Sequence, residues 1–307
     1  MSKKNLERIM IKKNNKLSKI IIPIAGLGTR MLPATKAIPK EMLPIVGKPI
    51  IQYIVEEAAE AGFKEIIFIT HSSKYSVENH FDTSFELEAT LEKRVKRSLL
   101  NEIKAISKLK VKIHSIRQGE ARGLGHAILC AKSIIQDNEP FAISLPDMLI
   151  QNRKKENNLS LMKKNFEIDG TSSILLGKAK KEEISKYGIV KIKKEIKSLA
   201  YGRIQKIVEK PNPSKAPSNL YVAGRYIFNN KLLNYLSDLK PDKTGEIQLT
   251  DAIKSFLVKE NNRLNGYILD GPIHDCGDKL GYLKANIEFA KEDPVISKDF
   301  LKYLKQQ

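Results

Sequence analysis

Residues 22–40, IPIAGLGTRMLPATKAIPK, place a glycine turn, an arginine and a lysine directly after an apolar strand. Gly26 and Gly28 allow the backbone to turn tightly and to approach a ligand with no side chain in between. Arg30 adds a planar cation that suits phosphate oxygens, and Lys40 adds a second positive charge. The segment therefore predicts a loop that binds a triphosphate.

Three prolines, Pro33, Pro39 and Pro44, disfavour a long helix through residues 31–43, so this segment is predicted to be a stiff loop. A G-x-G-x-x-G fingerprint would need a glycine where Met31 stands, and a Walker loop would need a G-K-[ST] sequence that is absent here. Dinucleotide cofactors and P-loop ATPase chemistry are therefore disfavoured. A structural glycine turn with solvated charges is the non-functional alternative.

A chain of 307 residues can bury one sizeable core. The sequence lacks the roughly 18 to 20 consecutive apolar residues of a membrane span, and its N-terminus lacks the apolar run of a signal peptide. We therefore expect a cytoplasmic protein with no membrane partner. Two distant cysteines, Cys130 and Cys276, make neither a disulfide framework nor a zinc site, and reduced, buried thiols are predicted.

The net charge of +19 is a feature that nucleic-acid-binding proteins often share. Here, however, the lysines are scattered along the whole chain instead of gathering with arginines and aromatic residues on one element. We therefore expect no nucleic-acid partner. The basic tail of residues 1–18 is predicted to be disordered.

Apolar runs alternate with segments of helical period, which predicts an α/β fold with a mixed, mostly parallel central sheet flanked by helices and a small additional β element. We expect a single domain at residues 19–292 and a C-terminal helical segment at 293–307. The strands are predicted at Lys19–Pro23, Glu65–Thr70, Val111–Ile116, Phe141–Leu145, Ser172–Ala179 and Val222–Phe228.

Helices are predicted at Ile50–Ala61 and Glu246–Lys259 from their apolar faces. Residues Phe85–Ile106 carry apolar residues at every fourth position, which predicts one long amphipathic helix whose stripe packs in the core or against another subunit. Gly188–Lys193 and Arg203–Val208 are predicted to form a hairpin or small sheet beside the main one.

Polar residues follow several predicted strands, and parallel strands bring such residues together at their carboxyl ends. Asp147 ends the strand FAISLPD, and Asp275 lies in HDCGD beside a glycine. Two carboxylates near a phosphate loop predict a Mg²⁺ site. The alternatives are ordinary Pro-Asp turn chemistry for Asp147 and a helix N-cap for Asp275, although Asp278 itself could cap that helix.

Gln118 follows another predicted strand, and its amide matches the edge of uracil or thymine. Gly123 and Gly125 would let the backbone lie against that base. A loop-to-helix junction with no ligand is equally consistent with these residues alone.

A sugar-phosphate site is predicted at the end of the second hairpin strand. Glu209 and Lys210 offer a carboxylate for sugar hydroxyls and an ammonium for a phosphate, and both reach one ligand only if the strand ends there. Tyr187 and Gly188 could complete this pocket. The histidines show no metal-ligand spacing and no serine lies in a nucleophile elbow, so direct transfer without a covalent intermediate is predicted.

The pattern G-x-G-T-R-x-x-P-x-T-x-x-x-P-K-x-x-x-P resembles the signature of the sugar-nucleotide pyrophosphorylases. Over roughly residues 18–290 the chain resembles the bacterial UTP:glucose-1-phosphate uridylyltransferases. The segments that carry this resemblance, besides the first pattern, are THSSK, ENHFDTSFELE, LEKRVKR, RQGEARGLGHA, VEKP, EIQLTDAI and HDCGDKLGY. This resemblance implies a Rossmann-like nucleotide-diphospho-sugar transferase fold, a requirement for Mg²⁺, and a homo-oligomer, either a dimer or a tetramer.

The resemblance also implies transfer of UMP from UTP to glucose 1-phosphate, giving UDP-glucose and pyrophosphate. The residues that it assigns to the nucleotide are Ala25, Gly26, Glu41, Gln118 and Gly123. It assigns Arg30 and Lys40 to the triphosphate, and Asp147 and Asp275 to the metal. It assigns Gly188, Glu209 and Lys210 to glucose 1-phosphate. Arg30, Lys40 and Lys210 would be the catalytic cations.

Three other functions remain open from the sequence. A thymidylyltransferase would differ in recognising one methyl group, which is worth only about 1 to 3 kcal/mol in a pocket. A nucleotide-sugar binding or regulatory protein on the same scaffold could have lost catalysis. Such a protein would have no need to retain all five charged residues, Arg30, Lys40, Asp147, Lys210 and Asp275. The net charge alone motivates a nucleic-acid-binding protein.

Overall fold

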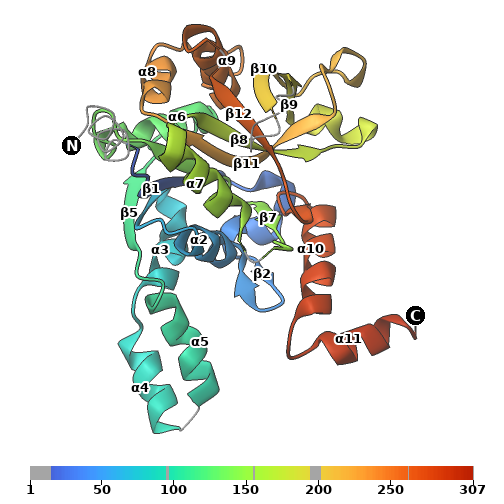
Figure 1. The fold of residues 1–307 in the computed structure, drawn as a ribbon. Helices are drawn as coiled ribbons and strands as arrows, with labels where there is room; N and C mark the ends of the chain where they lie inside the picture. Colours follow the sequence, from blue (N-terminus) through green and yellow to red (C-terminus); the bar gives the residue numbers. More distant parts are fainter. Residues whose placement is uncertain (1–14, 95–96, 155, 194–201, 262, 307) are drawn as a thin grey trace, which may run out of the picture.

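The computed structural model describes residues 15–94, 97–154, 156–193, 202–261 and 263–306. Its centre is a nine-stranded sheet in the order β5-β4-β1-β6-β11-β8-β12-β10-β9 (Figure 1). The strands of this sheet are β1 (Lys19–Pro23), β4 (Glu65–Thr70), β5 (Lys112–Arg117), β6 (Phe141–Ser144), β8 (Ser172–Lys178), β9 (Gly188–Lys193), β10 (Gly202–Glu209), β11 (Leu220–Phe228) and β12 (Leu264–Ile268).

The sheet is mixed, which confirms the predicted α/β class, but it is not mostly parallel as predicted, because its antiparallel pairings are at least as numerous as its parallel ones. Parallel pairing joins β5, β4, β1 and β6, and also joins β12 to β8. β11 pairs antiparallel with β6 and β8. The predicted hairpin of β9 and β10 is present, but it is continuous with the main sheet, since β10 pairs with β12 and β9 with β11.

Two short two-stranded sheets lie outside the main one. One joins β2 (Pro44–Ile45) to β3 (Lys48–Pro49), and the other joins β7 (Met148–Ile150) to β13 (Ile273–Asp275). The second of these two sheets carries Asp275, so it belongs to the functional site.

Helices cover both faces of the main sheet (Figure 1). One apolar cluster lies between the sheet and α2, α7 and α10, and the second lies between the sheet and α6, α8 and α9. The helices are α2 (Ile50–Glu60), α3 (Tyr75–Phe81), α4 (Phe85–Lys93), α5 (Arg97–Ser107), α6 (Gly123–Cys130), α7 (Asn158–Asp169), α8 (Lys231–Ser237), α9 (Leu249–Lys259), α10 (Lys279–Glu292) and α11 (Ser297–Leu304).

The proline-rich loop after β1 contains three short 3-10 turns instead of a long helix, as its prolines predict. These turns are η1 (Thr29–Met31), η2 (Ala34–Lys36) and η3 (Lys40–Met42). Four more occur elsewhere: η4 (Ser72–Lys74), η5 (Ala131–Ser133), η6 (Lys181–Lys186) and η7 (Pro213–Lys215).

The prediction of one long helix at Phe85–Ile106 is wrong. The segment forms α4 and α5, two helices that lie side by side and project from the body of the molecule (Figure 1). Leu91 of α4 is buried, whereas Leu87 of α4 and Leu99 of α5 remain 45% and 44% exposed. Periodicity alone could not reveal the break, because no glycine or proline marks it.

Packing begins before β1. Residues 1–14 of the predicted tail lie outside the described residues, but Leu17 is only 1% exposed and its N–H donates to Glu167 Oε1 at 3.2 Å. At the other end, α11 lies within the segment predicted to be helical. Cys276 is buried as predicted, whereas Cys130 is only half-buried.

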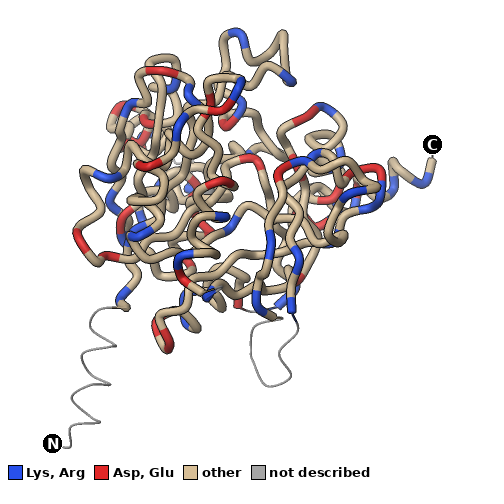
Figure 2. The backbone as a smooth tube through the Cα atoms, turned by 90° about the horizontal axis from the view of Figure 1, so that it is seen from above, with Lys and Arg blue, Asp and Glu red and all other residues tan. Residues whose placement is uncertain are grey.

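Basic residues are distributed over many elements and are interspersed with acidic ones (Figure 2). This distribution matches the scatter of lysines along the sequence. Within the described ranges, no helix has both the length and the apolar character needed to cross a membrane.

Candidate functional site

Three of the residues predicted to act on phosphate and metal converge around Gly277. A methyl group built on Gly277 would lie 2.6 Å from Arg30 Nη2, 2.9 Å from Asp275 Oδ1 and 3.1 Å from Asp147 Oδ2. The loop after β1, the end of β6 and the end of β13 therefore deliver a guanidinium and two carboxylates to one small region. Gly277 itself was not predicted as a site residue, and its only sequence signal is its position two residues after Asp275.

Lys40 joins this group through an ion pair, with Nζ donating to Asp147 Oδ2 at 2.6 Å. Burial lowers the pKa of Lys40, but the charges of Asp147 and Glu41 outweigh it and hold that pKa above its ordinary value. Burial raises the pKa of Asp147, but Lys40 outweighs it and holds that pKa below its ordinary value. Both shifts favour the charged forms, so the site contains an ammonium and a carboxylate near neutral pH.

Backbone pairing brings Asp275 beside Asp147. β13 pairs with β7 so that Asp275 lies opposite Met148, and the Cys276 N–H donates to the Asp147 carbonyl at 2.8 Å. Burial raises the pKa of Asp275, and the charge of Asp147 raises that pKa further. A divalent cation between the two carboxylates would relieve this repulsion.

The donor set of this site fits Mg²⁺. Asp147 and Asp275 offer only oxygen, and Mg²⁺ typically binds one or two carboxylates together with water and substrate phosphates. Across the part of the chain that the structure describes, no cluster of three or more His, Cys, Asp or Glu side chains forms a metal cage. The pair therefore suits a cation that arrives with a phosphate more than a permanently held ion.

The backbone at Ala25 and Gly26 provides an open surface at the start of the loop. The Ile24 N–H donates to the Ile69 carbonyl at 2.8 Å, which extends the pairing of β1 with β4 by one residue. Ala25 is buried, whereas a methyl group on Gly26 would meet no atom of the described residues within 4 Å. The space over Gly26 is therefore free for a ligand.

Gln118 follows β5 and is buried. Its Nε2 donates to the Gly123 carbonyl at 3.2 Å and lies 3.0 Å from His126 Nδ1. Burial lowers the pKa of His126, and Arg122 lowers it further, which favours a neutral ring that accepts from Gln118. With both amide N–H groups engaged, the Gln118 carbonyl oxygen is the atom left for a ligand.

The carboxylate of Glu41 is almost completely buried, at 1% exposed, and is paired with Lys74 at 2.8 Å. Lys74, in η4 after β4, was not predicted to be a partner. Glu41 Oε1 has no hydrogen-bond partner among the described residues. A buried, unpaired carboxylate oxygen is costly, and burial raises the pKa of Glu41 although the charge of Lys74 opposes that shift.

The structure shows why glycine is needed at positions 123 and 125, which the sequence alone did not reveal. A methyl group on Gly123, whose φ is +88°, would lie 2.8 Å from Glu246 Cβ, and one on Gly125 would lie 2.6 Å from the Ile247 carbonyl oxygen. Backbone hydrogen bonds at 2.8 Å also join these segments, from Gly125 to Ile247 and from Ile247 to Arg122. These glycines therefore allow α6 to pack against the segment before α9, a role that the sequence did not predict for them.

The predicted sugar residues meet at the edge of the sheet. β9 and β10 pair with Gly188 opposite Glu209, and a methyl group on Gly188 would lie 3.2 Å from Glu209 Oε2. Thr250, which was not predicted to contact the site, donates from its hydroxyl to that same oxygen at 2.6 Å. Lys210 is 64% exposed, and its Nζ lies 3.9 Å from Glu209 Oε1. Glu209 is thus held in place, whereas the Lys210 ammonium extends into solvent.

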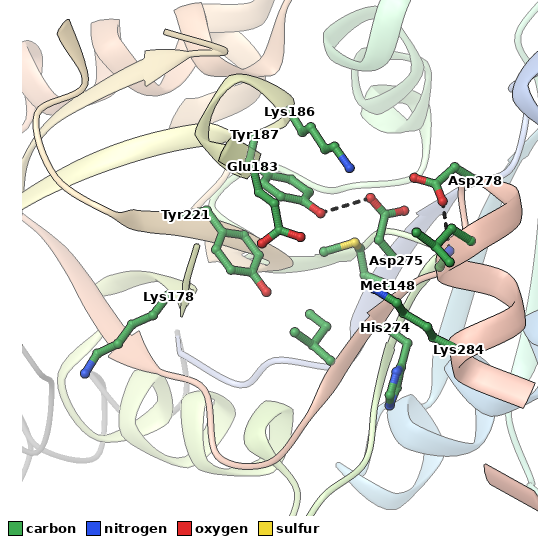
Figure 3. Close-up of a pocket in the computed structure, with 13 residues that line it drawn as sticks. Met148, Lys178, Glu183, Lys186, Tyr187, Tyr221, His274, Asp275, Asp278 and Lys284 are labelled. Carbon is green, nitrogen blue, oxygen red and sulfur yellow. Dashed lines mark hydrogen bonds between the residues drawn. The ribbon is translucent and has the colours of Figure 1, made fainter. Parts of the chain in front are cut away.

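Tyr187 connects the sugar side to the carboxylates. Its carbonyl accepts from the Lys210 N–H at 3.1 Å, and its hydroxyl donates to Asp275 Oδ2 at 3.2 Å (Figure 3). Its ring stacks on Tyr221 with centroids 4.6 Å apart. Both rings line a cavity of about 270 Å³ that also reaches Asp275. Tyr187 therefore also orients Asp275, in addition to the contribution to the sugar pocket that the sequence predicts for it.

Asp278 caps α10 by accepting from the Gly281 N–H at 2.8 Å (Figure 3). This interaction excludes the alternative in which Asp275 serves as the cap, and it leaves the Asp275 carboxylate for the site.

Comparison with known proteins identifies the family to which the chain belongs. The Nucleotidyl transferase family model matches residues 19–292. A UTP--glucose-1-phosphate uridylyltransferase from Haemophilus ducreyi is 48% identical over 292 residues, which is 94% of this chain and 98% of that protein. The chain belongs to the UTP--glucose-1-phosphate uridylyltransferase family.

Several solved structures are similar to this uridylyltransferase family member. A UTP-bound UGPase from Acinetobacter baumannii has a TM-score of 0.85 at 42% identity, covering 94% of this chain and 98% of that one. A UDP-glucose pyrophosphorylase complexed with UDP-glucose has a TM-score of 0.80 at 39% identity, covering 90% and 100%. A glucose-1-phosphate thymidylyltransferase structure from Bacillus anthracis, at 20% identity and TM-score 0.67, shares the fold alone.

Proposed function

We propose that this uridylyltransferase family member transfers UMP from UTP to α-D-glucose 1-phosphate, giving UDP-glucose and pyrophosphate. The observation that carries the proposal is the convergence of Arg30, Asp147 and Asp275 around Gly277, with Lys40 paired to Asp147. Two cations and two carboxylates beside an open glycine turn suit a nucleoside triphosphate that binds with a divalent cation. The UTP-bound and UDP-glucose-bound relatives support the substrate and the product.

The uracil ring would lie against the backbone of Ala25 and Gly26. The free carbonyl oxygen of Gln118 would accept the N3–H of uracil, a donor that cytosine lacks. Glu41 Oε1, buried and without a partner in the described residues, would accept a second hydrogen bond from the nucleoside. Gly123 contributes indirectly, because its carbonyl fixes the Gln118 amide.

Arg30 and Lys40 would bind the triphosphate, and Asp147 and Asp275 would hold the cation, for which we propose Mg²⁺. When bound, Mg²⁺ would neutralise phosphate charge and orient the phosphates. Arg30, which is solvent-exposed, would reach the charge that builds up on the departing pyrophosphate. Lys40 would exchange its ion pair with Asp147 for phosphate contacts once a cation occupies that carboxylate.

Glucose 1-phosphate would bind between Gly188, Glu209 and Lys210. The Glu209 carboxylate would accept from sugar hydroxyls, and the exposed Lys210 ammonium would neutralise the sugar phosphate. A phosphate oxygen of glucose 1-phosphate would then attack the α-phosphorus of UTP in line, forming one P–O bond as the bond to the β-phosphate oxygen breaks. The attacking oxygen is already anionic near neutral pH, so the step needs no general base.

The test is pyrophosphate release from the purified full chain with Mg²⁺ and glucose 1-phosphate, run in parallel with UTP, dTTP, ATP and GTP. We expect release with UTP that disappears without the metal or the sugar phosphate. A preference for dTTP would keep the mechanism but reject the base assignment. No release with any nucleotide would overturn the proposal.

We also propose that the enzyme acts in the cytoplasm and as a homo-oligomer, a dimer or a tetramer. Large apolar side chains exposed on α4 and near α11, including Phe85 at 81% and Val295 at 82%, support self-association. Light scattering coupled to size-exclusion chromatography tests this, and a monomer at micromolar concentration would reject it.

A further inference from the structure

Arg225, on β11, is one of the largest fully buried side chains of the described residues, at 0% exposed. Its guanidinium donates to the Glu57 carboxylate of α2 from Nε at 3.1 Å and from Nη2 at 2.6 Å. A buried arginine requires a partner of this kind, because an unpaired charge would be very costly in the core. The ion pair therefore fixes the guanidinium between the sheet and α2.

The guanidinium also donates to the turn that carries Asp147. Its Nη1 donates to the Leu145 carbonyl at 3.3 Å, and its Nη2 donates to the Met148 carbonyl at 2.8 Å. These two carbonyls lie on either side of Asp147 in the chain. One planar side chain thus holds both ends of the segment that presents this carboxylate.

The neighbouring backbone of β11 makes the same turn more rigid. The Leu145 N–H donates to the Gly224 carbonyl at 2.9 Å. Gly224 has a φ of +74°, and a methyl group there would lie 3.1 Å from Leu145 Cβ and 3.1 Å from Met148 Cγ. The register of β11 with β8 shifts between Val222 and Tyr226, and irregularities of this kind often re-aim a side chain.

The second carboxylate depends on the same turn. Met148 pairs with Asp275 across β7 and β13, and the Asp147 carbonyl accepts from the Cys276 N–H. We infer that Arg225, held by Glu57, is a positioning residue that sets the separation of Asp147 and Asp275 for a divalent cation. This inference rests on the proposed function, in which these two carboxylates bind the metal.

The test measures Mn²⁺ affinity of the full chain by electron paramagnetic resonance, with UTP present, alongside the thermal midpoint of each variant. The double variant Arg225→Met with Glu57→Leu replaces the ion pair by apolar groups, an exchange that proteins often tolerate. We expect its Mn²⁺ affinity to fall about tenfold or more, on the scale of losing groups that orient metal ligands. Arg225→Lys keeps the charge but cannot serve two carbonyls and Glu57 together, so it should also weaken Mn²⁺ binding.

The matched control is Lys19→Met with Glu139→Leu, which removes another largely buried ion pair, of 2.7 Å, from the start of β1. That pair makes none of the contacts to the turn at Asp147, so Mn²⁺ affinity should stay at the wild-type value. Folded Arg225 variants that bind Mn²⁺ like the wild type would overturn the inference. The variant Asp147→Asn distinguishes failure of this inference from failure of the proposed metal site. Wild-type Mn²⁺ affinity in that variant, or no Mn²⁺ binding by the wild type, would reject the metal site itself.

Discussion

The Thr250 hydroxyl lies 2.6 Å from Glu209 Oε2 and donates to it across the junction between α9 and β10. Gly188 lies against the same oxygen, since a methyl group on that glycine would come within 3.2 Å of it. The carboxylate that we propose for sugar recognition is thus oriented from two elements outside its own strand. This orientation leaves Oε1 as the Glu209 oxygen nearer to Lys210.

Thr250→Val should impair sugar binding selectively. Valine preserves the shape of threonine, but it removes a charge-assisted hydrogen bond to Glu209. We expect KM for glucose 1-phosphate to rise about tenfold while KM for UTP is unchanged. Thr250→Ser retains the hydroxyl and serves as the control in steady-state kinetics. Equal losses in the valine and serine variants would show that packing, not the hydrogen bond, matters here.

Arg30→Ala should reduce turnover without unfolding the protein. The side chain is exposed, so its loss removes little packing. We expect kcat to fall about 10²-fold or more, the scale of losing one preorganised charge contact to the transition state. Arg263→Ala removes another exposed arginine, before β12, and should leave kcat unchanged. Near-wild-type kcat in Arg30→Ala would contradict the assigned role.

Two glycine-to-alanine variants should separate binding from packing. Gly26→Ala places a methyl group where no described atom lies within 4 Å, so stability should hold while KM for UTP rises about tenfold because the base approaches there. Gly125→Ala instead drives a methyl group to 2.6 Å from the Ile247 carbonyl oxygen and should destabilise the fold by about 1 to 3 kcal/mol. Denaturant titration and UTP kinetics on both variants provide the check, and the reverse assignment of effects would contradict it.

The pH dependence of stability should include a contribution from His80. Its Nε2 lies 2.9 Å from Gln52 Oε1, and burial lowers its pKa, with Glu56 opposing that shift. The unfolded chain therefore takes up a proton more readily, and stability should fall as the pH drops below about 6.5 toward the lower folded pKa. His80→Gln should flatten the decline measured between pH 7.5 and 5.5 by denaturant unfolding. An unchanged slope would exclude this contribution.

The sequence was most informative for the charged residues that follow the end of a strand. The roles of Arg30, Lys40, Asp147 and Asp275 were all inferred from short motifs, and the structure brings their side chains together. Arg30, Lys40 and Asp147 are predictable because their loops follow β1 and β6, which are parallel strands. Asp275 reaches the same site differently, through the antiparallel pairing of β13 with β7.

Residues that act through tertiary contacts were not predictable in this way. Arg225 lies inside an apolar strand, and nothing in its sequence position indicates that it meets Glu57, 168 residues away. Thr250 and Lys74 likewise gain their roles only when distant segments pack. The packing of Gly125 against the Ile247 carbonyl oxygen was not predictable either, because a sequence does not show which distant backbone approaches a glycine.

The most direct test of the central claim follows the α-phosphate of UTP. Full-length protein would be incubated with Mg²⁺, glucose 1-phosphate and UTP carrying ³²P at the α position, and the products would be separated by chromatography. The proposed mechanism predicts label in UDP-glucose and none in pyrophosphate, with formation that requires both Mg²⁺ and the sugar phosphate. Label released as UMP, or retained in UTP under all conditions, would contradict it.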